Sequence, residues 1–297
     1  MNSAFTEFHS TAPPASVTAV FFEVTCADGE MWGNCPRYAP ARESSVSHMT
    51  YTPLESATAV LDHPVVPPGD DERVVGFGVM GFPFASGHCL ALRHFPATTF
   101  SPGYRSVWHR SPEGVWTFYA TTPGQLSCAR YFSAATPQDA VQCAVDIAWV
   151  NPWTLFVTID GLLEWTVDIR ATATTRMVSA LGRALPERAW TDRTALRVIG
   201  STAGAVLRAG TVRLTGTAPN GQRFMIAPRE VWLATGRATL GGVDLGSSGP
   251  LTEQARLGDF HVPQRGIFVV GSGHFDVYDP ACHQAAERTR PLPGTGA

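Results

Sequence analysis

The chain has 297 residues, 44% of them hydrophobic, and a formal net charge of −3 at pH 7. It can bury a substantial core, has no basic run that would indicate a nucleic-acid partner, and has no stretch approaching 18 consecutive apolar residues that would indicate a membrane span. All 22 basic residues are arginine, so every mechanism that needs a lysine is excluded, including Schiff-base catalysis and a Walker-type phosphate loop.

Residues 1–48 are rich in Ser, Thr, Ala and Pro and have weak periodicity, so we predict a disordered or loosely attached leader. An edge strand over residues 19–25 is the alternative. The apolar run 17–24 is too short for a secretory signal, and none of the six cysteines forms a C-x-x-C pair. We therefore expect a cytoplasmic protein with reduced thiols, no dedicated metal site and no cofactor.

From Glu72 onward, apolar and polar residues mostly alternate, which predicts β-strands. The links between them are short and turn-like, such as "SPEG" at 111–114 and Gly161, so sequential strands should pair antiparallel. The predicted strands are Arg73–Val79, Cys89–Phe95, Arg105–Arg110, Val115–Thr121, Val141–Val150, Thr154–Asp160 and Leu162–Arg170.

The period changes between residues 176 and 209, where apolar residues recur at helical spacing. Pro186 separates two predicted helices, and Gly210 ends the second. Strands resume at 211–215, 222–227 and 230–234, followed by one or two more before residue 280. The prediction is an all-β, antiparallel barrel of about ten strands over residues 49–280, with the helical pair inserted and a loose tail over 281–297.

Alternation sorts the side chains of these strands into two faces. On the third strand, Tyr104, Trp108 and Arg110 share one face and His109 lies on the other; on the fourth strand, Trp116 and Tyr119 lie on opposite faces. In strand 162–170 an apolar face opposes one that carries Glu164. The face that carries both polar and apolar residues is the mixed face, and two interpretations of it stay open. Either it is exposed to water, or it lines a lumen while the helical pair covers the apolar face.

Three residues are candidates for acid–base chemistry. His109 lies within a strand beside Arg110, and an imidazole titrates near neutral pH. In "GDFHVPQRG", Asp259 and His261 are two residues apart, so in an extended segment the carboxylate can orient the imidazole, and Arg265 can contact an anion. The alternatives are a strand histidine with a local hydrogen bond, and a simple turn.

The stretches "SVWHRSPEGVWTFYAT" and "IAWVNPWTLFVTIDGLLEWTVDI" resemble lipocalin-like barrels that include carotenoid 1,2-hydratases and polyketide cyclases. The resemblance covers residues 73–170 and rests on strand order and tryptophan-bearing hairpins. It carries over no catalytic residue. It implies a hydrophobic small molecule held in a lumen.

The leading hypothesis is therefore a barrel that binds an apolar small molecule, with or without cofactor-free acid–base chemistry of the hydratase, isomerase or cyclase type. The alternative is an interaction protein whose barrel is filled by its own side chains; a cavity of at least ~300 Å³ with convergent polar groups would favour the first. The oligomeric state is left open. The candidate catalytic residues are His109, Asp259 and His261, and the candidate ligand-binding residues are Tyr104, Trp108, Arg110, Trp116, Tyr119, Glu164 and Arg265.

Overall fold

The computed structural model describes residues 51–279, and the predicted leader and tail lie outside this range. The described residues are mostly β-structure. The helices are α1 (Pro53–Asp62), α2 (Ala129–Phe132), α3 (Ala173–Ala184) and α4 (Arg193–Leu207), with short 3-10 turns η1 (Gly124–Leu126), η2 (Ser133–Ala135) and η3 (Glu187–Trp190). The strands are β1 (Glu72–Pro83), β2 (Cys89–Thr98), β3 (Tyr104–Arg110), β4 (Trp116–Ala120), β5 (Val141–Gln142), β6 (Asp146–Asn151), β7 (Thr154–Ile159), β8 (Leu163–Arg170), β9 (Thr215–Thr217), β10 (Arg223–Leu240), β11 (Val243–Asp244), β12 (Arg256–Leu257), β13 (Phe260–His261) and β14 (Ile267–Phe275).

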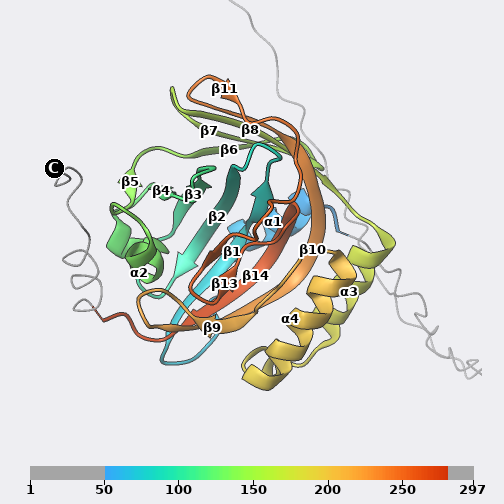
Figure 1. Ribbon diagram of the computed structural model, residues 1–297. Helices are drawn as coiled ribbons and strands as arrows, with labels where there is room; N and C mark the ends of the chain where they lie inside the picture. Colours follow the sequence, from blue (N-terminus) through green and yellow to red (C-terminus); the bar gives the residue numbers. More distant parts are fainter. Residues whose placement is uncertain (1–50, 280–297) are drawn as a thin grey trace, which may run out of the picture. The chain divides into compact units, whose positions relative to one another are not determined.

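The main sheet runs in the order β5-β4-β3-β2-β1-β14-β10-β8-β7-β6 and curls strongly (Figure 1). Strands β9 and β11 pair additionally with β10. All pairs in this sheet are antiparallel except β4 and β5, which run parallel. The prediction of a purely antiparallel barrel is therefore wrong: the sheet is mixed, and no ladder joins its end strands β5 and β6.

The mixed sheet has its origin in the segment predicted as one strand, Val141–Val150. The structure divides it into β5, which pairs with β4, and β6, which pairs with β7 at the opposite end of the sheet. Between them Val145 is fully buried in the core. The alternation in the sequence continues through this break, so the pattern alone could not reveal that the chain leaves one edge and joins the other.

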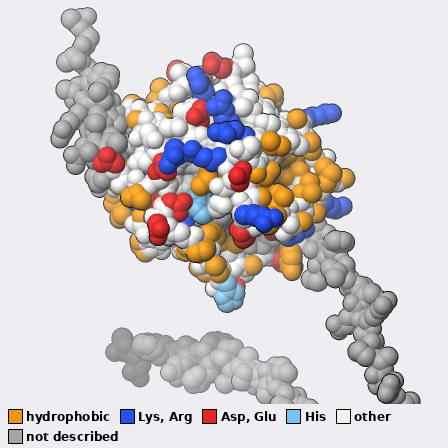
Figure 2. Space-filling model, turned by 90° about the horizontal axis from the view of Figure 1, so that it is seen from below, with side chains coloured by type: hydrophobic (Ala, Val, Ile, Leu, Met, Phe, Trp, Pro, Cys, Tyr) orange, Lys and Arg blue, Asp and Glu red, His pale blue; other side chains and the backbone are white. Residues whose placement is uncertain are grey.

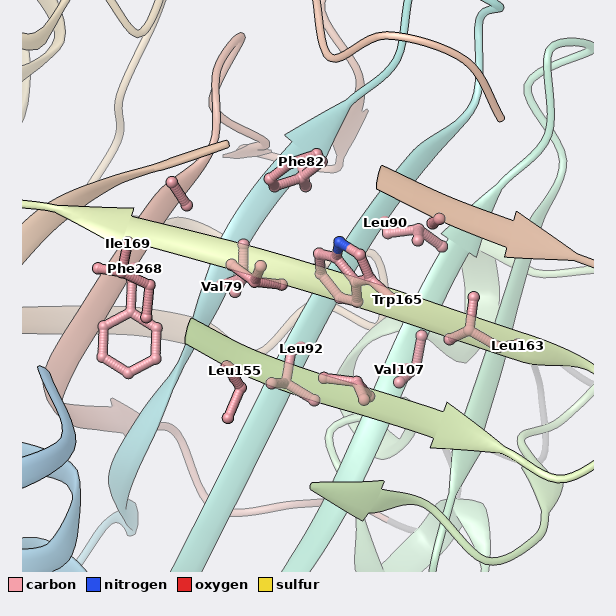
Figure 3. Close-up of a cluster of buried hydrophobic side chains, with 14 of the residues drawn as sticks. Val79, Phe82, Leu90, Leu92, Val107, Leu155, Leu163, Trp165, Ile169 and Phe268 are labelled. Atoms are coloured by element: carbon pink, nitrogen blue, oxygen red, sulfur yellow. The ribbon is translucent and has the colours of Figure 1, made fainter. Parts of the chain in front are cut away.

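One core fills the space inside the curl. Strands β7 and β8 cross over β1, β2 and β3, and apolar side chains from both layers meet between them (Figure 3). Trp165 of β8 and Phe82 of β1 are both completely buried there, with ring centroids 5.5 Å apart. The apolar face of β8 therefore packs against the sheet itself. The interpretation in which the helical pair covers this face is wrong. Glu164 points to the opposite, exposed face.

A second core covers the other face of β1–β4. Trp108 of β3 packs on Phe118, Phe132 and Phe260, with centroids 4.7, 5.0 and 5.9 Å away, so β4, α2 and β13 meet around one indole. Val107, the neighbour of Trp108 in sequence, lies in the first core. Strand β3 is thus buried on both faces, whereas the sequence analysis expected one apolar and one mixed face for this part of the sheet.

Two helices follow β8, as the change of period indicates. Thr172 caps the start of α3 with a capping box, Asp192 caps α4, and Arg208 ends α4 in the left-handed conformation. The two later segments predicted as separate strands form the single long strand β10. The strand predicted at 211–215 is displaced: β9 covers Thr215–Thr217 and overlaps the prediction only at Thr215. None of the described helices is long and apolar enough to cross a membrane.

Candidate functional site

An open groove lies between α3 and α4, which run side by side along β10 (Figure 1). On α3, Met177 and Leu181 are 52% and 57% exposed, and on α4, Val198 and Val206 are 63% and 40% exposed. All four line the groove. Apolar side chains gather on the same side of the molecule in Figure 2. A contiguous apolar surface of this kind marks a binding site more often than scattered exposed residues do.

Each helix is anchored to a different part of the chain. Helix α3 contacts β10 at Gly182, where a Cβ atom would lie 2.5 Å from the carbonyl oxygen of Arg229. The Ser179 hydroxyl accepts a hydrogen bond from the Val231 amide (2.9 Å) and donates one to the Val231 carbonyl (3.2 Å), in a stretch of β10 that lies between its pairings with β9 and β8. Helix α4 instead packs through Gly200 on the segment before β9. Because their anchors differ, the helices leave a groove between them.

The floor of the groove is formed by the sheet. Met80 of β1, Ile226 and Val231 of β10, and Ile267 and Val269 of β14 lie beneath the helices. The groove has a volume of about 340 Å³, which is within the range of small-molecule sites. Nearly all of its lining is apolar, with Arg213 and His261 as its charged or titratable residues.

A smaller cavity of about 50 Å³ adjoins the groove on the second-core face of the sheet. The two spaces share four lining residues, Met80, Ile226, Phe260 and Val269. The polar side chains that line the smaller cavity include Arg93 of β2, which is only 3% exposed, and Cys128. We refer to this space as the Arg93 cavity.

Arg93 is held by a bulge in β1. The pairing of β1 with β2 shifts register between Val79 and Phe82, which takes backbone carbonyls out of the ladder. Nη1 of Arg93 donates to the carbonyls of Val79 (2.7 Å) and Leu92 (2.8 Å), and Nη2 donates to that of Met80 (3.3 Å). The guanidinium carbon lies 4.5 Å from the centre of the Trp108 ring.

The thiol and phenol near Arg93 are neutral. Cys128 Sγ lies 2.8 Å from the Tyr104 hydroxyl. Burial raises the pKa of Cys128 to about 11 and raises the pKa of Tyr104 well above its usual value. Burial also lowers the pKa of Arg93, to about 10, which still leaves it positively charged at neutral pH.

Among the predicted site residues, Trp108 lines the Arg93 cavity and Tyr104 contacts Cys128 in its wall. Trp116 belongs to the same core but lines neither space; it packs on Phe118 with ring centroids 6.3 Å apart.

The predicted general acid or base His109 lies elsewhere. Its Nε2 is 2.9 Å from Nδ1 of His88, and the two rings stack. Burial, and then the neighbouring His88, lower the pKa of His109 to about 4. Arg110 donates hydrogen bonds to the carbonyls of Gly87 and Ser111 and so stabilises the turns at that end of the sheet.

Asp259 and His261 do not form the predicted dyad. The Asp259 carboxylate accepts hydrogen bonds from Arg213 and the Thr217 amide. His261 Nδ1 instead lies 3.0 Å from the backbone carbonyl of Asp259. His261 does line the groove, whereas Arg265 donates to the carbonyl of Leu207 at the end of α4.

The two remaining predicted residues also lie apart from the groove. Tyr119 packs half-buried against the first core, where burial raises its pKa. Glu164 is exposed on β8, opposite Thr158 and Thr239 of the neighbouring strands. The structure thus brings Tyr104 and Trp108 together near one cavity, and places His261 on the adjoining groove.

Sequence reasoning selected neither Arg93 nor Cys128 as a candidate site residue. A signal for Arg93 was present: in "CLALRH" the arginine shares a strand face with Cys89 and Ala91, which is an unusual place for a charge. The exposed apolar residues of α3 and α4 gave no such signal, because they follow the same helical spacing as a stripe that faces a core.

Other features of the described residues offer less to a ligand. Within residues 51–279, no group of three or more His, Cys, Asp or Glu side chains could hold a metal ion. A larger cavity of about 820 Å³ borders α1 and η3. There Arg183 pairs with Glu230 and Arg229 pairs with Glu187, so these charges are already compensated.

No protein-family model matches the sequence, and no curated protein matches it. Among solved structures, the chain has a likeness to the acetoacetate decarboxylase of Legionella pneumophila, with 11% sequence identity and a TM-score of 0.33. The match covers 72% of this chain and 87% of the other. The lipocalin-like resemblance is not confirmed beyond the coarse feature of a curled, barrel-like β-sheet.

Proposed function

We propose that the chain binds an apolar small molecule in the groove between α3 and α4. The observation that carries the proposal is the set of exposed apolar side chains, Met177, Leu181, Val198 and Val206, which line one concave space above an apolar floor. Their exposure to water is unfavourable, and a ligand that covers them gains the free energy of removing both surfaces from water.

The proposal places the ligand outside the curl of the sheet. The interior between β8 and β1–β3 is filled by side chains such as Trp165 and Phe82, so an apolar ligand would have to displace the core there. The groove needs no such displacement. No reaction is part of the proposal, because His109, Asp259 and His261 do not meet at the groove.

Native mass spectrometry of the purified full chain, followed by organic extraction, tests the proposal first. We expect either a co-purifying apolar molecule or 1:1 binding of members of a panel of fatty acids, terpenes and polyenes. A chain that is empty and binds none of them would overturn the proposal.

Two variants locate the site. Ala203 lines the groove on α4, whereas Ala205 lies on the exposed side of the same helix and does not line it. We expect Ala203→Trp to fill the groove and abolish binding, and Ala205→Trp to leave binding unchanged. Equal effects of both substitutions would place the ligand elsewhere.

A further inference from the structure

The Arg93 cavity contains a buried positive charge with no negative partner. Arg93 is 3% exposed, yet no carboxylate among residues 51–279 forms an ion pair with it. Buried charges are generally paired, because removing a charge from water without compensation is costly. This arginine is therefore an exception that needs an explanation.

Part of the explanation is structural. The guanidinium has five N–H donors, and three hydrogen bonds to backbone carbonyls of β1 and β2 use both donors of Nη1 and one of Nη2. The Nε donor and the second Nη2 donor have no partner among the described residues. Nε and Nη2 form one edge of the planar group, and such an edge matches the two oxygens of a carboxylate.

Two further polar groups beside Arg93 lack partners. Ser106 lies opposite Arg93 in the pairing of β2 with β3, and its buried hydroxyl makes no hydrogen bond. The buried Nε1–H of Trp108, which lines the same cavity, also makes none. Ser106 and Trp108 lie on the same face of the sheet as Arg93, on the neighbouring strand β3, so an acceptor placed in the cavity could receive hydrogen bonds from more than one buried donor.

The remaining groups around the cavity do not supply that acceptor. Cys128 and Tyr104 are neutral, as their raised pKa values require, and their side chains contact each other. The carboxylate of Glu72 is already bound by Arg130 and Tyr131. The cavity therefore presents a cation and neutral donors, an arrangement that selects an anion.

We propose that the ligand of the groove is an amphipathic carboxylic acid, whose carboxylate lies in the Arg93 cavity on the Nε–Nη2 edge and whose apolar part lies between α3 and α4. This inference rests on the proposed function, because the tail occupies the groove proposed there. The two spaces adjoin at Met80, Ile226, Phe260 and Val269, which line both, and this adjacency supports a single ligand that reaches from one to the other. The small volume of the cavity, about 50 Å³, favours a flat carboxylate over a tetrahedral phosphate or sulfate.

The wild-type chain tests the proposal directly. Decanoic acid, decan-1-ol and decyl phosphate have the same tail and differ in the head group, and their dissociation constants at pH 7 can be compared by calorimetry. We expect the acid to bind at least about tenfold more tightly than the alcohol, as one or more charge-assisted hydrogen bonds would give. We also expect it to bind more tightly than the phosphate.

The outcomes separate this proposal from the one on which it rests. Equal binding of acid and alcohol would overturn the carboxylate proposal and leave the groove as an apolar site. A preference for the phosphate would overturn the choice of carboxylate. Failure of all three compounds to bind would overturn the carboxylate proposal, whereas the groove proposal is decided by the wider panel of fatty acids, terpenes and polyenes.

The role of Arg93 is tested by Arg93→Met, which keeps an unbranched side chain without the charge. We expect the preference for the acid over the alcohol to disappear while the alcohol binds as before. The control is Arg237→Met, because Arg237 is an exposed arginine of β10 that lines neither space, and it should keep the preference. A preference that survives in Arg93→Met would overturn the assignment.

A second measurement keeps the assignment testable if Arg93→Met does not fold. Decanoic acid labelled with ¹³C in its carboxyl group is bound to the wild-type chain, and the carboxyl signal is followed from pH 7 downward by NMR. Contact with a guanidinium lowers the pKa of a carboxyl group, so the bound signal should titrate at lower pH than the free acid. A bound carboxyl that titrates like the free acid would overturn the proposal.

Discussion

The apolar side chains at the rim of the groove allow ligand binding to be changed with little effect on folding. The perturbation is the double substitution Leu181→Gln and Val198→Gln, one residue on each helix. Both side chains are more than half exposed, at 57% and 63%, so the folded state gains little from them. Glutamine is also compatible with a helix interior. We expect the free energy of unfolding to change by less than about 0.5 kcal/mol per site.

The effect on binding should be much larger. Full burial of a Leu or Val side chain contributes about 1.5–3 kcal/mol, and a ligand that covers the exposed half of each would recover about 1 kcal/mol per residue. The double variant should therefore lose about 2 kcal/mol of binding free energy, which corresponds to a dissociation constant raised about 30-fold. Fluorescence displacement of an apolar dye by decanoic acid measures the change, and urea unfolding measures the stability.

Val243→Gln is the matched control. Val243 is 64% exposed, like the two test residues, but it belongs to β11 and does not line the groove. It should leave the dissociation constant unchanged. If the double variant binds as tightly as the wild type, or if the control weakens binding as much, the exposed residues of α3 and α4 do not form the binding surface.

Three further predictions concern the scaffold. Phe268→Ala removes a fully buried ring that packs on Phe77 and Trp232, and should lower the free energy of unfolding by about 3–5 kcal/mol in urea denaturation; a cost below 1 kcal/mol would contradict the filled interior. Gly271→Ala should destabilise the chain far more than Gly249→Ala, because its Cβ would lie 2.2 Å from the Ala227 carbonyl oxygen, whereas the nearest atom at Gly249 is 3.7 Å away; similar melting temperatures for the two variants would refute this. Burial, and then His88, lower the pKa of His109 to about 4, so the unfolded chain binds more protons than the folded chain and stability should fall as pH decreases from about 6.5 toward 4. Urea midpoints at pH 7 and pH 5 should therefore differ less in His109→Gln than in the wild type, and an equal difference would exclude His109 as a cause.

The sequence was most informative where one physical requirement determined the pattern. Along β8, alternation separated Trp165 from Glu164, and the structure buries the first and exposes the second. The helical period after residue 170 likewise identified the region of α3 and α4. In both cases one face is apolar, so the period of the pattern was enough to identify the element, although in α3 the apolar residues Met177 and Leu181 line the groove and are not buried in a core.

The sequence was less informative where an element is buried on both faces or lies between two partners. Strand β3 supplies Val107 to one core and Trp108 to the other, so it has no polar face that could show on which side of the sheet the site lies. Which strands meet across the curl depends on pairings distant in sequence, such as β1 with β14. Alternation carries no information about such pairings. For this reason the sequence analysis predicted a ligand-binding lumen inside the curled sheet, where the structure has a core filled by side chains.

The location of the candidate site follows from the irregularities of the sheet. A regular β1 would pair its carbonyls with its two neighbours β2 and β14, and Arg93 would then lack the two β1 acceptors it has at this depth. The shift of register between Val79 and Phe82 supplies those acceptors, so the charge can be buried with three hydrogen bonds. These bonds fix the guanidinium in place and leave Nε and one donor of Nη2 without a partner among the described residues. The anionic head group of the proposed ligand would therefore meet a cation that is already fixed in position beside the apolar groove, which favours affinity.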